Sequence, residues 1–178
     1  SLDISILKND ESAPKTIHLK RETVQIDNVI YSGIIRPGVG YISLEEFNAS
    51  ATKELKSALS TLKQAGMQKL ILDLRENPGG LLTQAVDICN LFLAKETKIV
   101  ETRGKVEEWN KTYTALNTSF DSDIPLIILI NGHSASAAEI VAGVMQDYDR
   151  AVLIGKKSYG KGLVQVTRDL PYRTKMKI

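Results

Sequence analysis

The sequence predicts an α/β fold built from repeated strand–helix units. Three times a short apolar segment is followed by a turn and then by a segment of helical character, over residues 38–66, 69–93 and 125–146. Residues 125–130 are continuously apolar, as in strands buried on both faces. Leu55, Leu59 and Leu62 repeat at helical spacing. These observations indicate ββα or βα units around one core.

The other segments predict further strands. Residues 98–118 carry apolar side chains among charged ones, which is typical of a β-hairpin with one exposed face. Residues 151–155 predict a fourth buried strand, and residues 160–166 a turn entering a fifth. Near the N-terminus, alternation predicts a small β segment over residues 2–6, 17–19, 24–26 and 29–31.

Composition narrows the class without giving a function. The chain is 43% hydrophobic and 25% charged, as in ordinary globular proteins. Its net charge is only +2 and the lysines are scattered, so we do not expect nucleic acid as a partner. The single cysteine, Cys89, lies in an apolar segment and predicts a buried, inert thiol.

The ends of the chain and its hydropathy indicate a piece of a larger protein. No apolar stretch approaches the ~20 residues that span a bilayer. The first residues also lack the basic-then-apolar layout of a secretion signal. Since the chain starts without methionine in one expected strand and stops in another, we expect it to be an excerpt.

Two turns are candidates for a chemical site, because each follows a buried strand and precedes a helix. Such turns expose side chains and backbone N–H groups at the edge of a sheet. In residues 73–80, Gly79 and Gly80 permit backbone conformations that direct amides at a developing negative charge. In residues 131–139, Ser136 stands near the positive end of a helix dipole. Ser136 is therefore a candidate nucleophile with an oxyanion hole partly built.

Lys161 is the candidate base, because it lies between Gly160 and Gly162 after an apolar strand. A lysine acts as a base only when its pKa falls from about 10.4 towards about 7–8, and burial among apolar groups has that effect. On an alternating strand, Gln165 would point to the same face and hold the amine in place.

Each feature taken alone has a simpler structural interpretation. Asn-Pro-Gly-Gly is commonly only a tight turn, a serine at a helix start is usually a cap, and an isolated loop lysine is usually solvated. A histidine base is disfavoured here. His18 lies far in sequence from both turns, and His133 is too close to Ser136 along a tight turn for the usual triad geometry.

Four motifs in order resemble the carboxyl-terminal processing, or tail-specific, serine proteases. They occupy residues 73–80, 134–140, 146–151 and 155–165. The resemblance implies that Ser136 is the nucleophile and Lys161 the base, 25 residues later. It also implies an oxyanion hole from the amide of Gly79 or Gly80 and that of Ala137, with Gln165 positioning the lysine.

The resemblance further implies a fold like that of the crotonase and Clp protease group. Residues 1–25 would be the closing strands of an incomplete PDZ domain, and residues 26–178 a C-terminally truncated catalytic core. The implied partners are protein or peptide substrates held by their C-terminal tails, no cofactor or metal is expected, and the implied location is extracytoplasmic. Ala138, where the family usually has serine, and His133, where it commonly has a small residue, depart from the pattern.

Two other functions remain open from the residues. A crotonase-like acyl-CoA enzyme shares repeated units and paired oxyanion amides but has no need of a serine and a lysine together. A noncatalytic fragment or peptide-binding scaffold would keep the fold without the chemistry.

Overall fold

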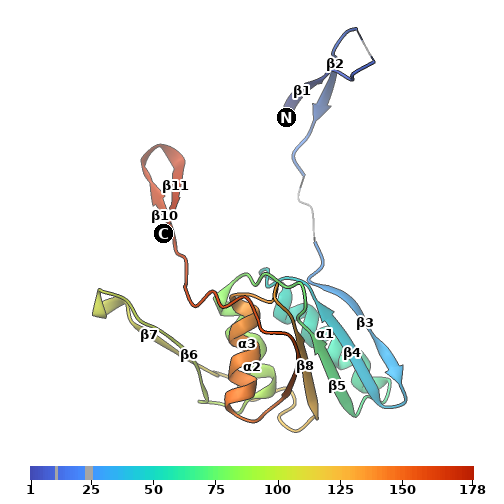
Figure 1. Ribbon diagram of the computed structural model, residues 1–178, viewed down its shortest axis with the longest axis vertical. Coiled ribbons are helices and arrows are strands. Elements are labelled where there is room, and N and C mark those ends of the chain that lie inside the picture. Colours follow the sequence, from blue (N-terminus) through green and yellow to red (C-terminus); the bar gives the residue numbers. More distant parts are fainter. Residues whose placement is uncertain (11, 23–25) are drawn as a thin grey trace.

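The computed structural model describes residues 1–10, 12–22 and 26–178 and is organised around one five-stranded sheet. The strand order is β3 (Val29–Arg36), β4 (Val39–Leu44), β5 (Lys69–Asp73), β8 (Leu126–Ile130) and β9 (Val152–Gly155). The first two strands form an antiparallel hairpin, whereas β4, β5, β8 and β9 run parallel. Their carboxyl ends therefore meet at one edge, the upper edge of the body in Figure 1.

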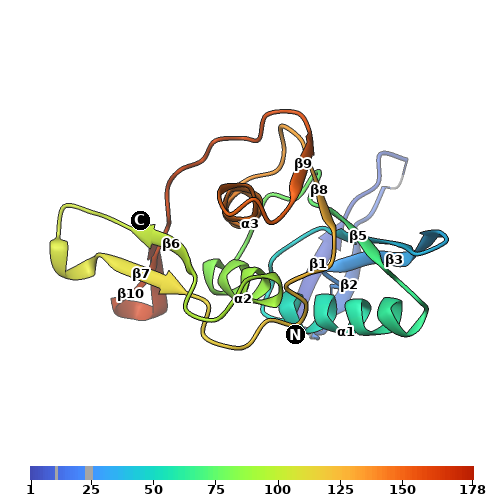
Figure 2. The same cartoon turned by 90° about the horizontal axis from the view of Figure 1, so that it is seen from below.

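Three helices connect these strands and lie on one side of the sheet (Figure 2). They are α1 (Ala51–Gln64), α2 (Leu82–Phe92) and α3 (Ala137–Asp147). Alternate side chains of β4 are buried against them, and Leu72 and Ile128 of the central strands are fully inaccessible. The predicted α/β architecture with strand–turn–helix repeats is confirmed.

Cys89 lies in this core, fully buried on α2. Burial raises the pKa of its thiol well above the ordinary value, so the thiolate is not formed near neutral pH. The predicted inert, buried thiol is confirmed.

Three hairpins extend from the sheet-and-helix body. β6 (Lys98–Thr102) and β7 (Lys111–Thr114) form the hairpin predicted for residues 98–118, with the short helix η1 (Glu107–Trp109) at its tip. β1 (Leu2–Ile6) pairs with β2 (Lys15–Leu19) at the N-terminus. At the C-terminus, β10 (Thr167–Leu170) pairs with β11 (Thr174–Lys177), joined by the short helix η2 (Pro171–Arg173).

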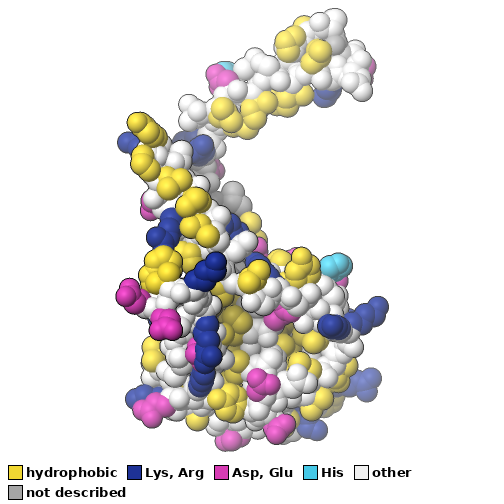
Figure 3. Space-filling view, turned by 60° about the vertical axis from the view of Figure 1, so that its left-hand side comes forward, with side chains coloured by type: hydrophobic (Ala, Val, Ile, Leu, Met, Phe, Trp, Pro, Cys, Tyr) yellow, Lys and Arg dark blue, Asp and Glu magenta, His cyan; other side chains and the backbone are white. Residues whose placement is uncertain are grey.

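The N-terminal hairpin carries exposed apolar side chains. The uppermost arm in Figure 3 is the N-terminal hairpin, and hydrophobic side chains follow its length. Ile4 and Ile17, which face each other across that hairpin, are each 38% exposed. No helix in the described ranges is long and apolar enough to cross a membrane.

The structure corrects several strand predictions. The segment predicted as a turn entering a fifth strand, residues 160–166, leads into β10, and Val166 already exchanges backbone hydrogen bonds with Ile178. Residues 161–165 form no strand, and the strand that follows them pairs in the C-terminal hairpin rather than in the main sheet. β9 is not buried, because it is an edge strand paired only with β8, and Val152 is 62% exposed. Residues 29–31 belong to β3 of the main sheet rather than to a separate N-terminal segment. The strand predicted at residues 24–26 falls largely outside the described residues.

Candidate active site

The two predicted turns lie side by side because β5 and β8 are neighbours in the sheet. Asp73 at the end of β5 pairs with Leu129 of β8, and the turns that follow are joined by hydrogen bonds. Ser134 Oγ donates to the Leu74 carbonyl at 2.7 Å, and the Ala135 amide donates to the Asn77 carbonyl at 3.0 Å. Ser134 and Asn77 are fully buried, so these bonds are shielded from water.

Ser136 is held in an unusual backbone conformation at the start of α3. Its φ is 56° and its ψ is −114°, a left-handed region that L-residues other than glycine rarely occupy. Such a conformation costs on the order of 1–3 kcal/mol and persists where the surroundings impose it. The side chain remains partly accessible at the mouth of a cavity. This strained, accessible serine is the geometry expected of a nucleophile.

Gly79 packs directly against the Ser136 turn. A Cβ at Gly79 would lie 2.7 Å from the Ser136 Cβ and 2.8 Å from the Ala137 nitrogen. Its φ of 98° also favours glycine. The glycine predicted from the sequence is therefore required for the two turns to approach each other.

The amides around Ser136 differ in whether they are free to bind a ligand. The Gly79 amide donates to Asn77 Oδ1 at 2.8 Å, and Asn77 Nδ2 donates to the Leu44 carbonyl at 2.8 Å. Within the described part of the chain, the amides of Gly80 and Ala137 donate to no partner. Asn77 thus accepts a hydrogen bond from the Gly79 amide, whereas the Gly80 amide is available to a ligand.

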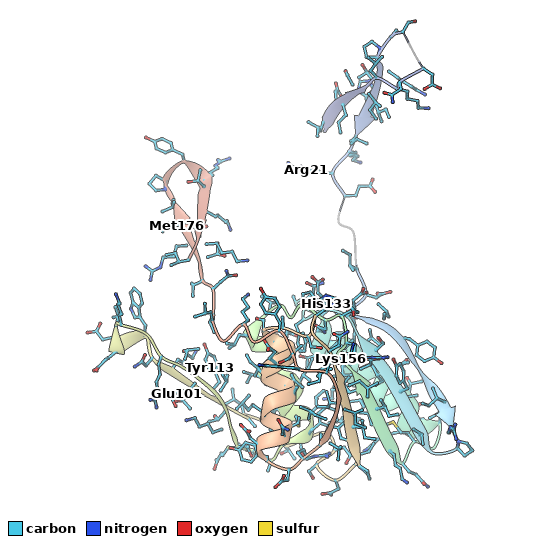
Figure 4. The ribbon with its side chains drawn as sticks, in the orientation of Figure 1. Arg21, Glu101, Tyr113, His133, Lys156 and Met176 are labelled. Atoms are coloured by element: carbon cyan, nitrogen blue, oxygen red, sulfur yellow. The ribbon has the colours of Figure 1, made fainter. Side chains whose placement is uncertain are left out.

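A cavity of about 880 Å³ is lined by all six residues predicted for the site, namely Gly79, Gly80, Ser136, Ala137, Lys161 and Gln165. Its other walls come from β6, through Val100 and Glu101, and from the C-terminal hairpin, through Thr167 and Lys177. Figure 4 shows Glu101 on the arm that flanks this side of the body. Segments far apart in the sequence therefore converge on Ser136.

Lys161 and Gln165 meet without the predicted strand between them. Lys161 Nζ lies 3.5 Å from Gln165 Oε1, at the long limit of a hydrogen bond, although residues 161–166 are not a strand. Lys161 is partly buried, and Gln165 is exposed. Lys161 and Ser136 are both among the described residues, and no hydrogen bond joins Lys161 Nζ to Ser136 Oγ. The structure therefore brings Lys161 to the cavity of Ser136 without a direct bond between the two side chains.

Glu139 also lines the cavity, although the sequence did not predict a role for this residue. Its Oε2 accepts the Ser136 amide at 2.8 Å and the Lys161 amide at 3.1 Å. Its Oε1 accepts the Ser158 hydroxyl at 2.8 Å and the Gly160 amide at 2.6 Å. One carboxylate therefore ties the nucleophile turn to the lysine loop. The signal in the sequence was Ser-x-x-Glu at a helix start, the pattern of a capping box.

The pKa of Glu139 reflects these contacts. Burial acts to raise it, but the hydrogen bonds from Ser158 and from the amides of Lys161, Gly160 and Ser136 outweigh burial and hold the pKa below its usual value. The carboxyl group is therefore ionised at neutral pH and is committed to holding the site together.

His133 does not approach Ser136 but points to the neighbouring turn. Its Nδ1 lies 2.6 Å from Glu76 Oε2, and Figure 4 shows the residue at the edge where the parallel strands end. The expectation that neither histidine serves as base for Ser136 agrees with this contact. His18 is paired with Asp3 on the N-terminal hairpin.

Gly79→Ala is expected to destabilise the protein more than Gly66→Ala. Both glycines have positive φ, 98° and 86°, so both changes impose about 1–2 kcal/mol of backbone strain. Only at Gly79 does the added Cβ also collide with the Ser136 turn, which adds about 1–3 kcal/mol. Urea unfolding of the two variants measures the difference, and equal losses would contradict the close approach of the turns.

Most of the chain is similar to known proteins. Residues 38–178 match the family described as Peptidase family S41. A carboxyl-terminal-processing protease of Picosynechococcus sp. is 38% identical over 96% of this chain and 41% of its own length. One from Synechocystis sp. is 41% identical over 92% of this chain and 38% of its own length. The chain thus spans about two fifths of the length of these relatives.

The fold is also found among solved structures. The photosystem II D1 C-terminal processing protease superimposes with a TM-score of 0.72 and 27% identity, covering 99% of this chain and 49% of that one. An S41 protease from Bacteroides fragilis gives a TM-score of 0.74 at 22% identity over 98% of this chain and 51% of that one.

Proposed function

The chain belongs to peptidase family S41, and we propose that it carries the catalytic centre of a serine endopeptidase that cleaves proteins near their C-terminal tails. One observation carries the proposal. A strained, accessible Ser136 shares a cavity with Lys161 and with Gly80 and Ala137, whose amides have no partner in the described chain. The names of the relatives, carboxyl-terminal-processing proteases, support the preference for tails.

The proposed reaction proceeds through an acyl-enzyme. Neutral Lys161 Nζ takes the proton of Ser136 Oγ while Oγ bonds to the carbonyl carbon of the scissile peptide. The tetrahedral intermediate then collapses, the C–N bond breaks, and the lysine ammonium gives its proton to the leaving amine. Water, deprotonated by Lys161, next attacks the ester and releases the new carboxyl terminus together with free serine.

The oxyanion of the intermediate is assigned to the amides of Gly80 and Ala137. Both residues line the cavity of Ser136, and both amides are without a partner in the described chain, whereas the Gly79 amide is already bonded to Asn77. An oxyanion hole works because its donors are in place before charge develops. The role of Gly79 in this proposal is to allow close approach, and that of Gly80 is to donate.

Gln165 is proposed to orient the base. The contact of 3.5 Å between Lys161 Nζ and Gln165 Oε1 is long in the free protein. Catalytic hydrogen bonds often shorten only when substrate is bound. Substrate in the cavity would displace water around Lys161 and favour its neutral form.

The finer assignments rest on the family resemblance. We propose that residues 1–25 are the last strands of a PDZ-like domain and that residues 26–178 form the catalytic core. The paired strands β1 and β2 are consistent with such a segment. The extracytoplasmic location is proposed on the same basis.

Labelling of Ser136 tests the proposal directly. A fluorophosphonate probe is expected to modify Ser136, identified by mass spectrometry of the peptide that contains it, and Ser136→Ala is expected to abolish labelling. Ser57→Ala is the control, because Ser57 is exposed on α1 and does not line the cavity, and it is expected to leave labelling unchanged. Ser134→Ala and Ser158→Ala are unsuitable, because the Ser134 hydroxyl is bonded to the Leu74 carbonyl and the Ser158 hydroxyl to Glu139. Undiminished cleavage of a C-terminally tagged substrate by Ser136→Ala would exclude this serine as the nucleophile.

A further inference from the structure

We propose that Glu76 and His133 are a pair of positioning residues that set the oxyanion turn against the nucleophile turn. The inference rests on the proposed function, because it concerns the spacing between the Gly80 amide and Ser136. Glu76 lies three residues before Gly79, and His133 lies three residues before Ser136. Neither residue was assigned a role by the sequence motifs.

The pair forms a closed bridge between the two turns. Glu76 Oε2 contacts His133 Nδ1 at 2.6 Å, and Glu76 Oε1 accepts Asn131 Nδ2 at 2.6 Å. Asn131 Oδ1 in return accepts the amides of Glu76 and His133, each at 3.1 Å. Every polar atom of the Glu76 carboxylate is therefore used by the turn that leads to Ser136.

The backbone of Glu76 is shaped for this contact. Its φ is 63°, a left-handed conformation that costs a non-glycine residue about 1–2 kcal/mol. Glycine would adopt it without that cost, but glycine would have no carboxylate. Glu76 thus combines a strained backbone with a carboxylate that contacts Asn131 and His133 of the other turn.

Two layers of contacts connect the turns, and they differ in chemistry. The lower layer is buried and cannot titrate: Ser134 Oγ bonds to the Leu74 carbonyl, and the Ala135 amide to the Asn77 carbonyl. The upper layer is the exposed bridge, in which the side chains of Glu76 and His133 are 65% and 75% accessible. An exposed ion pair adds little to global stability. A displacement of about 1 Å in a reacting group, however, can cost about a hundredfold in rate.

Charged groups of both signs surround the bridge, and the carboxyl group of Glu76 is held in its ionised form. Hydrogen bonding by Asn131 first, and then the contact with His133 and the charge of Arg75, hold the pKa of Glu76 below its usual value. Asp27, Glu45 and Glu46 line a smaller cavity together with Glu76 and add negative potential. On the other side, Lys156 follows β9, with its amide bonded to the Ile130 carbonyl, and Lys157 follows it.

Glu76→Gln, His133→Gln and the double variant test the pair in the intact protease. Each single change is expected to lower kcat for a tagged peptide about tenfold, with KM within twofold and an unchanged urea midpoint. The double variant is expected to resemble either single one, because each change alone breaks the same bridge.

Lys63→Gln is the matched control, because it removes the 2.6 Å ion pair between Lys63 and Asp121, which lies outside the cavity around Ser136. It is expected to leave kcat unchanged. Unchanged kcat in Glu76→Gln and His133→Gln, additive effects in the double variant, or a fall in activity matched by lost stability would each overturn the proposal.

Amide hydrogen exchange separates this proposal from the proposed function. Broken bridges are expected to speed exchange at the Ala135 amide, which donates to the Asn77 carbonyl between the turns, and at the Gly79 amide, which donates to Asn77 Oδ1 within the first turn. This readout does not require catalysis. An active Ser136→Ala variant would refute the peptidase mechanism, whereas unaltered exchange in both bridge variants would refute the bridge.

Discussion

Lys161→Ala is expected to lower the rate of Ser136 acylation by about 10²–10⁴-fold, the range typical of a positioned general base. The amine shares the cavity of Ser136, and among the described side chains no histidine is hydrogen-bonded to that serine. Lys161→Arg should be equally impaired, because guanidinium keeps the positive charge but does not deprotonate in proteins. Single-turnover acylation by an ester substrate measures the effect.

Lys157→Ala provides the control within the same loop. Lys157 is exposed and does not line the cavity, so its removal is expected to leave acylation unchanged. Parent-like acylation by Lys161→Ala would show that another group is the base. Activity retained by Lys161→Arg but lost in Lys161→Ala would instead indicate a purely electrostatic role.

Glu139→Gln is expected to lower kcat by about 100-fold and to destabilise the protein by about 2–4 kcal/mol. The carboxylate accepts four hydrogen bonds, from Ser136, Ser158, Gly160 and Lys161. An amide has only one acceptor oxygen, so its NH₂ would face two of these donors. Hydrogen bonds to charged groups contribute about 1.5–3 kcal/mol each. Loss of two of them would loosen both the serine turn and the lysine loop.

The same residue gives a pH dependence of stability with a definite sign. The pKa of Glu139 is lowered in the folded protein, so its contribution is fully present above the unfolded value and is lost as pH falls through the folded one. The stability difference between parent and Glu139→Gln is therefore expected to be constant near pH 7 and to shrink below about pH 4.5. Urea titrations across this range measure it.

Glu108→Gln is the control for Glu139→Gln, since Glu108 is an exposed carboxylate in η1 at the tip of the β6–β7 hairpin. It should change neither kcat nor stability beyond about 0.5 kcal/mol. If kcat and stability of Glu139→Gln were as little changed as those of Glu108→Gln, Glu139 would have no role in the site.

The order of elements could be predicted because it depends on local chemistry. Apolar segments bounded by glycine turns predicted β4, β5 and β8, and leucine spacing predicted α1. Which strands lie at the edge of the sheet could not be predicted from local chemistry. Val152 looks like a core residue by hydropathy, yet it is exposed because β9 has a neighbour on one side only. Residues 161–165 have strand-like composition but pair with no strand in the described fold, and pairing begins only at Val166, opposite Ile178.

The sequence by itself determined which residues are chemically eligible: a serine at a helix start, a lysine between glycines and a glycine pair in a turn. Only the tertiary structure decided how they are used. The pairing of β5 with β8 brings the turns together, Asn77 occupies the Gly79 amide and leaves that of Gly80, and Glu139 joins the serine turn to the lysine loop. These choices depend on contacts between residues far apart in the chain, and composition and spacing carry no information about such distances.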